Sequence, residues 1–175
     1  MRGGQILFNK WSGYGLLLLI IFIVQSTLID AVRIFGVMPN LIICVLVAVS
    51  LAEGHVAGGL IGMFAGIFID VTVADVRGFF VIILLIIGGL LGYLSNDYMK
   101  SSAYNAFLLC APVSFLYNTL IFFTHFYNYS AGGVLRIYLT KIIPEALYTA
   151  ALAVPMFFIV RAIGKTARLD DEYPA

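Results

Sequence analysis

Residues 54–70, GHVAGGLIGMFAGIFID, decide the fold of this chain, because an apolar run carries glycines at a strict four-residue spacing and ends at Asp70. Residues four apart lie on the same face of an α-helix, so this helix has one face of bare backbone. In a membrane, such a face lets a second helix approach closely. A carboxylate near hydrocarbon is costly, and Asp70 therefore needs a partner or water. The stretch predicts a membrane helix built for packing or docking through Gly54, Gly58, Gly62 and Gly66.

The composition places the whole chain in the membrane class. Of 175 residues, 62% are hydrophobic and 11% are charged, and the mean hydropathy is +1.05. Soluble domains carry about 25% charged residues. The net charge of +1, without a basic run, argues against nucleic-acid binding. Cys44 and Cys110 lie inside apolar runs, and we interpret both as small buried side chains.

The hydropathy pattern predicts one domain, residues 1–175, folded as a compact all-α bundle of about six transmembrane helices. The second and third segments are short for the roughly 20 residues that a span needs, so they form either two thin spans or a re-entrant hairpin. Pro39 marks the start of the second segment, because proline suits the first helical turn. The predicted segments are Tyr14–Ile29, Leu41–Ala52, Val56–Ile69, Phe79–Leu94, Ala103–Thr124 and Ile142–Val160.

The distribution of lysine and arginine predicts the orientation in the membrane. An even number of crossings brings both termini to one side, and that side holds six cations against four on the other. Cytoplasmic loops carry the excess of positive charge, so we expect both termini in the cytoplasm. The six are Arg2, Lys10, Lys100, Arg161, Lys165 and Arg168, and the four are Arg33, Arg77, Arg136 and Lys141.

The outer half of the predicted bundle collects charges of both signs. Glu145 follows a proline in the first turn of the last helix, where a negative charge is favourable, and Lys141 lies four residues earlier. These charges either neutralise one another at the headgroups or form an outer docking site or small-molecule pocket. The set is Asp30, Arg33, Asp70, Asp75, Arg77, Arg136, Lys141 and Glu145.

Patterns of catalytic and metal-binding residues are weak in this chain. Glu53 and His55 lie in the short turn between the second and third segments, and we interpret them as solvated turn residues. His55 and His125 fall on opposite predicted sides of the membrane, without other ligands at metal-binding spacing. We therefore expect no enzyme activity, no cofactor and no metal. A second glycine face, with Gly88, Gly89 and Gly92, either packs on the first face or receives a partner's helix.

Several stretches in the first half of the chain resemble one family. They are Gln25-Ser26-Thr27, then Gly36-Val37-Met38-Pro39-Asn40-Leu41, then Gly62-Met63-Phe64-Ala65-Gly66-Ile67-Phe68-Ile69-Asp70, then Arg77-Gly78. This order resembles the bacterial rod shape-determining protein MreD. That family has Pro-Asp-Leu at the start of its second helix and a Gly-x-Phe-x-Gly-x-x-x-Asp run in its third. Asn40 departs from the pattern, because the family commonly has aspartate there, and beyond Gly78 only the hydropathy agrees.

The resemblance implies a non-enzymatic scaffold of the cell-elongation machinery in the bacterial cytoplasmic membrane. The implied direct partner is MreC, with RodA, its penicillin-binding partner and MreB reached through it. The family is also similar in fold to the substrate-binding components of energy-coupling-factor transporters, so a vitamin- or metal-binding transport component is the alternative. The candidates for partner binding or helix packing are Gln25, Pro39, Asn40, Gly54, Gly58, Gly62, Phe64, Gly66, Asp70, Gly78 and Glu145.

Overall fold

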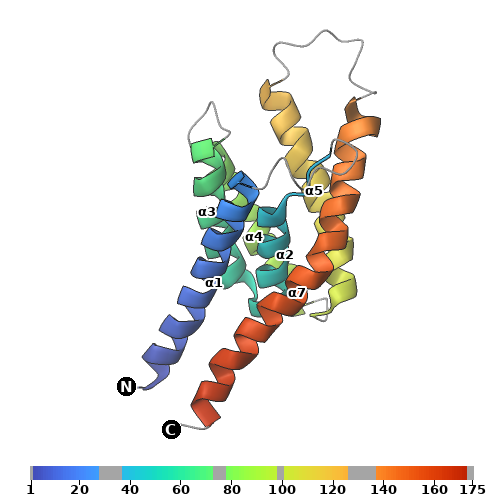
Figure 1. Ribbon diagram of the computed structural model, residues 1–175. Coiled ribbons are helices and arrows are strands. Elements are labelled where there is room, and N and C mark those ends of the chain that lie inside the picture. Colours follow the sequence, from blue (N-terminus) through green and yellow to red (C-terminus); the bar gives the residue numbers. More distant parts are fainter. Residues whose placement is uncertain (1, 28–36, 73–77, 98–100, 126–136, 173–175) are drawn as a thin grey trace.

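The computed structural model describes residues 2–27, 37–72, 78–97, 101–125 and 137–172, and the elements in these ranges are helices (Figure 1). This confirms the predicted all-α class for the described residues. The helices are α1 (Arg2–Thr27), α2 (Leu41–Glu53), α3 (His55–Thr72), α4 (Phe79–Asp97), α5 (Ala103–His125) and α7 (Ile143–Glu172), the last preceded by a π-helical turn over Tyr138–Ile142.

Three predicted helix starts agree with the structure. Other predicted bounds differ, because the helices continue into polar residues. α2, α4 and α5 begin at the predicted Leu41, Phe79 and Ala103. α1 already begins at Arg2, and α7 continues to Glu172, well beyond the predicted Val160. Hydropathy detects the apolar part of a helix only, whereas alanine, arginine, lysine and glutamate also favour the helical state outside it.

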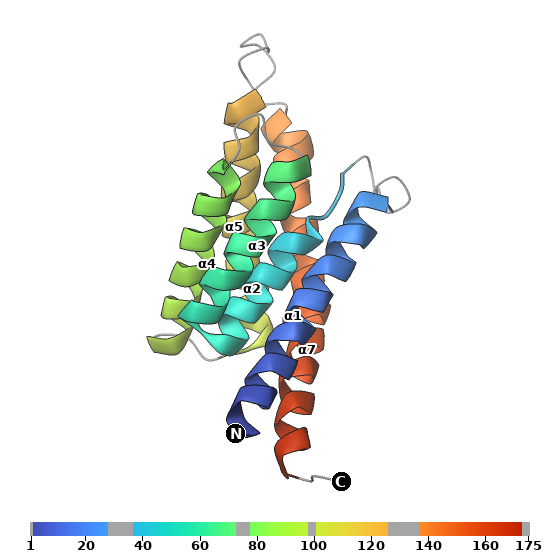
Figure 2. The ribbon, with the colours of Figure 1, turned by 90° about the vertical axis from the view of Figure 1, so that its left-hand side faces the viewer.

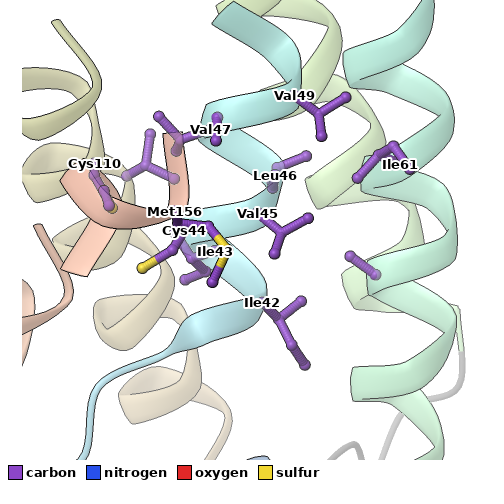
Figure 3. Packing of buried hydrophobic residues seen from close by; sticks show 14 of the residues in the cluster. Ile42, Ile43, Cys44, Val45, Leu46, Val47, Val49, Ile61, Cys110 and Met156 are labelled. Atoms are coloured by element: carbon purple, nitrogen blue, oxygen red, sulfur yellow. The ribbon is translucent and has the colours of Figure 1, made fainter. Parts of the chain in front are cut away.

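α2 forms the centre of the bundle and contacts α1, α3, α4, α5 and α7. Every residue from Ile42 to Leu51 is buried, as expected for a helix that is apolar on all sides. Figure 3 shows its side chains between Ile61 of α3 on one side and Cys110 of α5 and Met156 of α7 on the other. A helix of 13 residues is about 20 Å long, so α2 is enclosed by longer helices.

The outer helices surround α2 as an incomplete ring. α4 packs on α3, α3 contacts α1, α1 contacts α7, and α7 packs on α5. Between α4 and α5 the rings of Phe80 and Tyr117 meet, with their centroids 5.6 Å apart. Consecutive helices alternate in direction, and the start of α1 and the end of α7 lie at the same end of the molecule (Figure 2).

The outward faces of the ring are strongly apolar. Soluble monomers rarely expose contiguous apolar patches of this kind, whereas lipid-facing helices require them. By length and composition, three described helical stretches are able to cross a membrane: His55–Thr72, Ala103–Phe123 and Tyr138–Lys165. Outward side chains that are at least half exposed include Leu16 and Ile23 of α1, Phe64 and Val71 of α3, Ile82 and Ile86 of α4, Phe123 of α5 and Phe158 of α7.

The turn between α2 and α3 explains why residue 54, the first of the four regularly spaced residues, is a glycine. Gly54 has φ +87°, in the left-handed region that favours glycine, and its N–H donates to the carbonyl of Ser50 at 3.1 Å. The two predicted short segments are therefore an antiparallel pair of helices. α3 is longer than predicted, because it continues through Asp70 to Thr72.

Candidate functional site

The glycine face of α3 is filled by α4. A Cβ atom added at Gly58, Gly62 or Gly66 would overlap the α4 backbone at Gly88, Leu84 or Val81 respectively. At the other end of the contact, a Cβ atom on Gly92 would overlap the backbone of Gly54 and His55. We call this contact, made by Gly54, Gly58, Gly62 and Gly66 against α4, the glycine seam. Its glycines let two helices of the same chain pack backbone to backbone, as small residues do in membranes.

Phe64 lies between the seam glycines in sequence but points away from α4. Its side chain is 50% exposed, beside the exposed Leu60 and Ile67 of the same helix.

Two further glycines, Gly59 of α3 and Gly89 of α4, border the seam, and each has room for a side chain. A Cβ atom on Gly59 would have only van der Waals contacts, at 3.8 Å from the Leu85 carbonyl oxygen, and one on Gly89 would meet nothing within 4 Å. The stretch Gly62–Asp70 therefore has an inward, structural part and an outward part.

Asp70 caps the start of α4. Its carboxylate accepts hydrogen bonds from the backbone N–H groups of Gly78 (3.0 Å), Phe80 (3.1 Å) and Val81 (3.2 Å). Gly78 reaches this position with φ +89°, a conformation that favours glycine. The first N–H groups of a helix lack partners within it, and a carboxylate there is stabilised by the helix dipole. The partner that Asp70 needed is thus the neighbouring helix of the same chain.

Gln25, Asn40 and Thr149 connect three helices at the start of α2. The side chain of Asn40 is the N-cap and accepts from the N–H of Ile43 at 3.2 Å, while its own N–H donates to Thr149 Oγ1 at 3.0 Å. Gln25 Oε1 of α1 accepts from the N–H of Leu41 at 2.8 Å. Asparagine caps as well as aspartate does, so the departure from the family pattern keeps the cap and leaves a buried position without charge.

The prediction for Pro39 was one position off. The helix begins at Leu41 with Asn40 as its cap, so Pro39 precedes the cap and is outside the first turn. The physical reason is the capping hydrogen bond, which makes Asn40, and not the proline, the last non-helical residue. Pro39 is itself buried, so it contributes to packing as well as ending the preceding segment.

α5 and α7 contribute polar side chains to the same region. Tyr117 lies against Asn40, and Asn118 faces Glu145, which is half-buried in the first turn of α7. The thiol of Cys44 donates to the Thr149 carbonyl at 3.2 Å. We call Gln25, Asn40, Tyr117, Asn118, Glu145 and Thr149, together with the buried Ser114 one turn before Asn118, the polar cluster at the start of α2.

The sequence pointed to only part of this cluster. Gln25, Asn40 and Glu145 were candidates, whereas Ser114, Tyr117 and Thr149 were not. A signal was present, because Ser114 and Asn118, and likewise Glu145 and Thr149, are polar pairs at four-residue spacing in otherwise apolar helices. Lys141, four residues before Glu145, does not pair with it, and no other described cation does. Asp30, Arg33, Asp75, Arg77 and Arg136 lie outside the described residues.

The end of the bundle that carries the start of α1 and the end of α7 is held by a separate contact (Figure 2). Tyr14 of α1 donates a 2.7 Å hydrogen bond to Glu53 Oε1 at the end of α2. Gly164 of α7 leaves room for this pair, because a Cβ atom there would lie 3.0 Å from the tyrosine oxygen. The interpretation of Glu53 as a solvated turn residue was therefore wrong. Its carboxylate is held by α1, while His55 beside it is exposed.

These arrangements define a helical bundle with an apolar exterior, whose polar groups mostly connect its own helices. Among the described residues, no three histidine, cysteine, aspartate or glutamate side chains gather at a site that would hold a metal ion. Comparison of the chain with family models, with curated proteins and with solved structures finds no match.

Proposed function

We propose that this protein is a non-enzymatic scaffold of the bacterial cell-elongation complex, with six spans in the cytoplasmic membrane and both termini in the cytoplasm. Its direct partner is MreC, through which it reaches RodA, its penicillin-binding partner and MreB. The proposal rests on the resemblance of residues 25–78 to MreD. The start of α1 and the end of α7 lie at one end of the bundle, which supports placing both termini on the same side of the membrane (Figure 2).

The observation that carries the proposal is the use of the motif residues inside the fold. Gly62 and Gly66 bring α3 onto α4, Asp70 caps α4, and Asn40 caps α2. An enzyme motif is expected to bring reactive side chains to one place, with a base in hydrogen-bond reach of its target. Here the motif builds a rigid bundle and leaves an aromatic side chain, Phe64, on the outside. That division suits a protein that acts by holding a partner.

The surface around Phe64 is our candidate for binding the transmembrane helix of MreC. The glycine seam is already occupied by α4, so a partner helix needs another surface. Phe64 is half exposed beside Leu60 and Ile67, and the open backbone at Gly59 and Gly89 lies on the outside of the same helix pair. Without side chains at these glycines, a partner helix is able to come close, which favours association in lipid.

Co-purification with MreC tests this function. The chain and its MreC are co-expressed, and the complex is captured through a tag on MreC. We expect Phe64→Ala to reduce capture at least several-fold. Phe158→Ala is the matched control, since Phe158 is a similarly exposed phenylalanine (58%) on α7, which is on another side of the bundle. Failure of the wild-type chain to form a complex would overturn the function. Equal capture of both variants would overturn the proposed surface.

A second candidate, a solute-binding component of a vitamin or metal transporter, is favoured by one observation. Ser114 and Asn118 have buried polar atoms without a partner, next to Glu145. Mass spectrometry of the purified protein distinguishes the two functions. A stoichiometric vitamin or metal supports the transporter component, and its absence together with a stable MreC complex supports the scaffold.

A further inference from the structure

The two cysteines of the chain, Cys44 of α2 and Cys110 of α5, meet in the core of the bundle although they are far apart in sequence. Both are free thiols, and both are fully buried. The two thiol groups are hydrogen-bonded to each other. Figure 3 shows Cys44 and Cys110, with Met156 of α7, on one side of α2. A single buried cysteine is chemically inert, but a contacting pair has its reaction partner in place.

The hydrogen bonds of this pair direct the two sulfur atoms toward each other. The thiol of Cys44 donates to the carbonyl of Thr149 at 3.2 Å, so its hydrogen is directed at α7. The hydrogen bond between the two thiols is therefore donated by Cys110 and accepted by the sulfur of Cys44. A disulfide needs two sulfur atoms that face each other, and from this arrangement only small shifts of the two side chains are required.

The depth of the pair in the bilayer separates it from the reductants of the cytoplasm. Cys110 belongs to the stretch Ala103–Phe123, which is long and apolar enough to cross a membrane. It lies about 10 Å from the start of that stretch, at a rise of about 1.5 Å per residue. Cytoplasmic thiols are kept reduced by glutathione and thioredoxin, which are charged and water-soluble. Hydrocarbon excludes charged molecules, whereas a small neutral oxidant such as hydrogen peroxide is able to enter it.

We infer that Cys44 and Cys110 are a site of oxidation by a neutral peroxide, which converts them to a disulfide between α2 and α5. One sulfur attacks hydrogen peroxide, the O–O bond breaks, and a sulfenic acid and one water form. The second sulfur then attacks the sulfenic acid. The S–S bond forms as the S–O bond breaks, and a second water leaves. The two thiol hydrogens leave in the two waters and the peroxide is reduced, so no charge stays in the bilayer.

The disulfide strengthens a contact that is light in the reduced protein. α5 packs mainly on α7 and to a smaller extent on the central helix α2. A disulfide stabilises a fold by restricting the unfolded chain, and the effect is larger for a long loop such as the one between Cys44 and Cys110. Oxidation therefore fixes α5 on α2. The site goes beyond the proposed scaffold function and does not depend on it, since the partner surface around Phe64 is on α3.

Thiol counting on the full chain in lipid nanodiscs tests the inference. The protein is treated with hydrogen peroxide, catalase removes the excess, and the chain is denatured and treated with N-ethylmaleimide. We expect maleimide on both cysteines of the untreated chain, and on neither cysteine of the treated chain until dithiothreitol is added. Peptide mass spectrometry should find the fragments with Cys44 and Cys110 linked within one chain. Cys110→Ala is the control without a linked fragment, because it keeps the bond from Cys44 to Thr149.

Thermal unfolding measures the effect of the bond on the fold. We expect peroxide to raise the Tm of the wild type by roughly 5 °C or more and to leave that of Cys110→Ala without a rise. Met156 is also oxidisable, so both measurements are repeated in Met156→Leu, which separates a sulfoxide from a disulfide. The inference is overturned if both cysteines still take up maleimide after a peroxide dose that oxidises the denatured chain. A link found only between two chains, or a disulfide without a rise in Tm, overturns it as well.

Discussion

The carboxylate of Asp70 near the C-terminal end of α3 accepts a 3.1 Å hydrogen bond from the backbone N–H of Phe80, in the first turn of α4. Two more N–H groups, those of Gly78 and Val81, donate to the same side chain. The glycine seam brings the two helices together along their length, and Asp70 fixes their relative position at one end. One short stretch of sequence thus encodes both the contact and its alignment.

Asp70→Ala should destabilise the protein more than a typical surface substitution does. Loss of an N-cap side chain costs about 0.5–2 kcal/mol, and here three N–H donors lose their acceptor in a buried place. We expect a loss of about 2 kcal/mol or more in the free energy of unfolding, measured by denaturant titration in mixed micelles. Asp70→Asn keeps one acceptor oxygen and should lose less. Equal stability of Asp70→Ala and the wild type would contradict the capping role.

Gly62→Leu should separate α3 from α4, whereas Gly89→Leu should not. A side chain at Gly62 overlaps the backbone carbonyl of Leu84, which cannot move without shifting the whole helix, while a Cβ atom at Gly89 meets nothing within 4 Å. We expect Gly62→Leu to give little folded protein by size-exclusion chromatography in detergent and Gly89→Leu to elute as the wild type does. Two normal elution profiles would show that the seam tolerates side chains.

If the protein has the proposed scaffold function, the same pair of variants also guides assays of cell shape. Because Gly62→Leu disturbs the fold, loss of rod shape in that variant would not identify a partner surface. Gly89→Leu and Phe64→Ala change only the exterior, so their effects on shape report on binding. A variant of each kind is therefore needed in one strain background.

Asn40→Ala should cost about 0.5–2 kcal/mol, the usual cost of losing an N-cap, because Ile43 loses its hydrogen-bond acceptor at the start of the central helix. Asn40→Asp keeps the acceptor and places a negative charge at a helix N-terminus. We therefore expect the aspartate variant to be the more stable of the two in thermal unfolding. The reverse order would show that burial of the charge outweighs the cap.

The sequence was sufficient for the positions of the helices and for the presence of a tight helix contact, and the reasons are local. Asn40 and Gly78 are turn and capping residues, so α2 and α4 begin where expected. The four-residue spacing of glycines predicts a face of α3 without side chains, whichever helix packs against it. Spacing within one helix says nothing about which helix lies opposite, so the occupant of the seam was open until the contact with Gly88 and Leu84 was seen.

The polar cluster at the start of α2 was less predictable, because its members are isolated polar residues in apolar helices. Thr149 and Tyr117 come together with Asn40 through the rotation of α5 and α7 about their own axes, which is set by packing around α2. Glu53 was misinterpreted for a similar reason. Its partner, Tyr14, lies on a helix far away in sequence, and the short turn beside it suggested water instead.

Tyr14→Phe should lower the free energy of unfolding by about 1.5–3 kcal/mol, the usual range for a hydrogen bond to a charged group. The phenol is almost fully buried and donates to Glu53 at 2.7 Å, and phenylalanine keeps the ring but removes the donor. Tyr93→Phe is the matched control, because Tyr93 is 51% exposed on α4. Denaturant unfolding of both variants measures the difference. If the two variants unfold alike, the hydrogen bond between α1 and α2 does not contribute to stability, and the packing of Tyr14 alone holds α1 on α2.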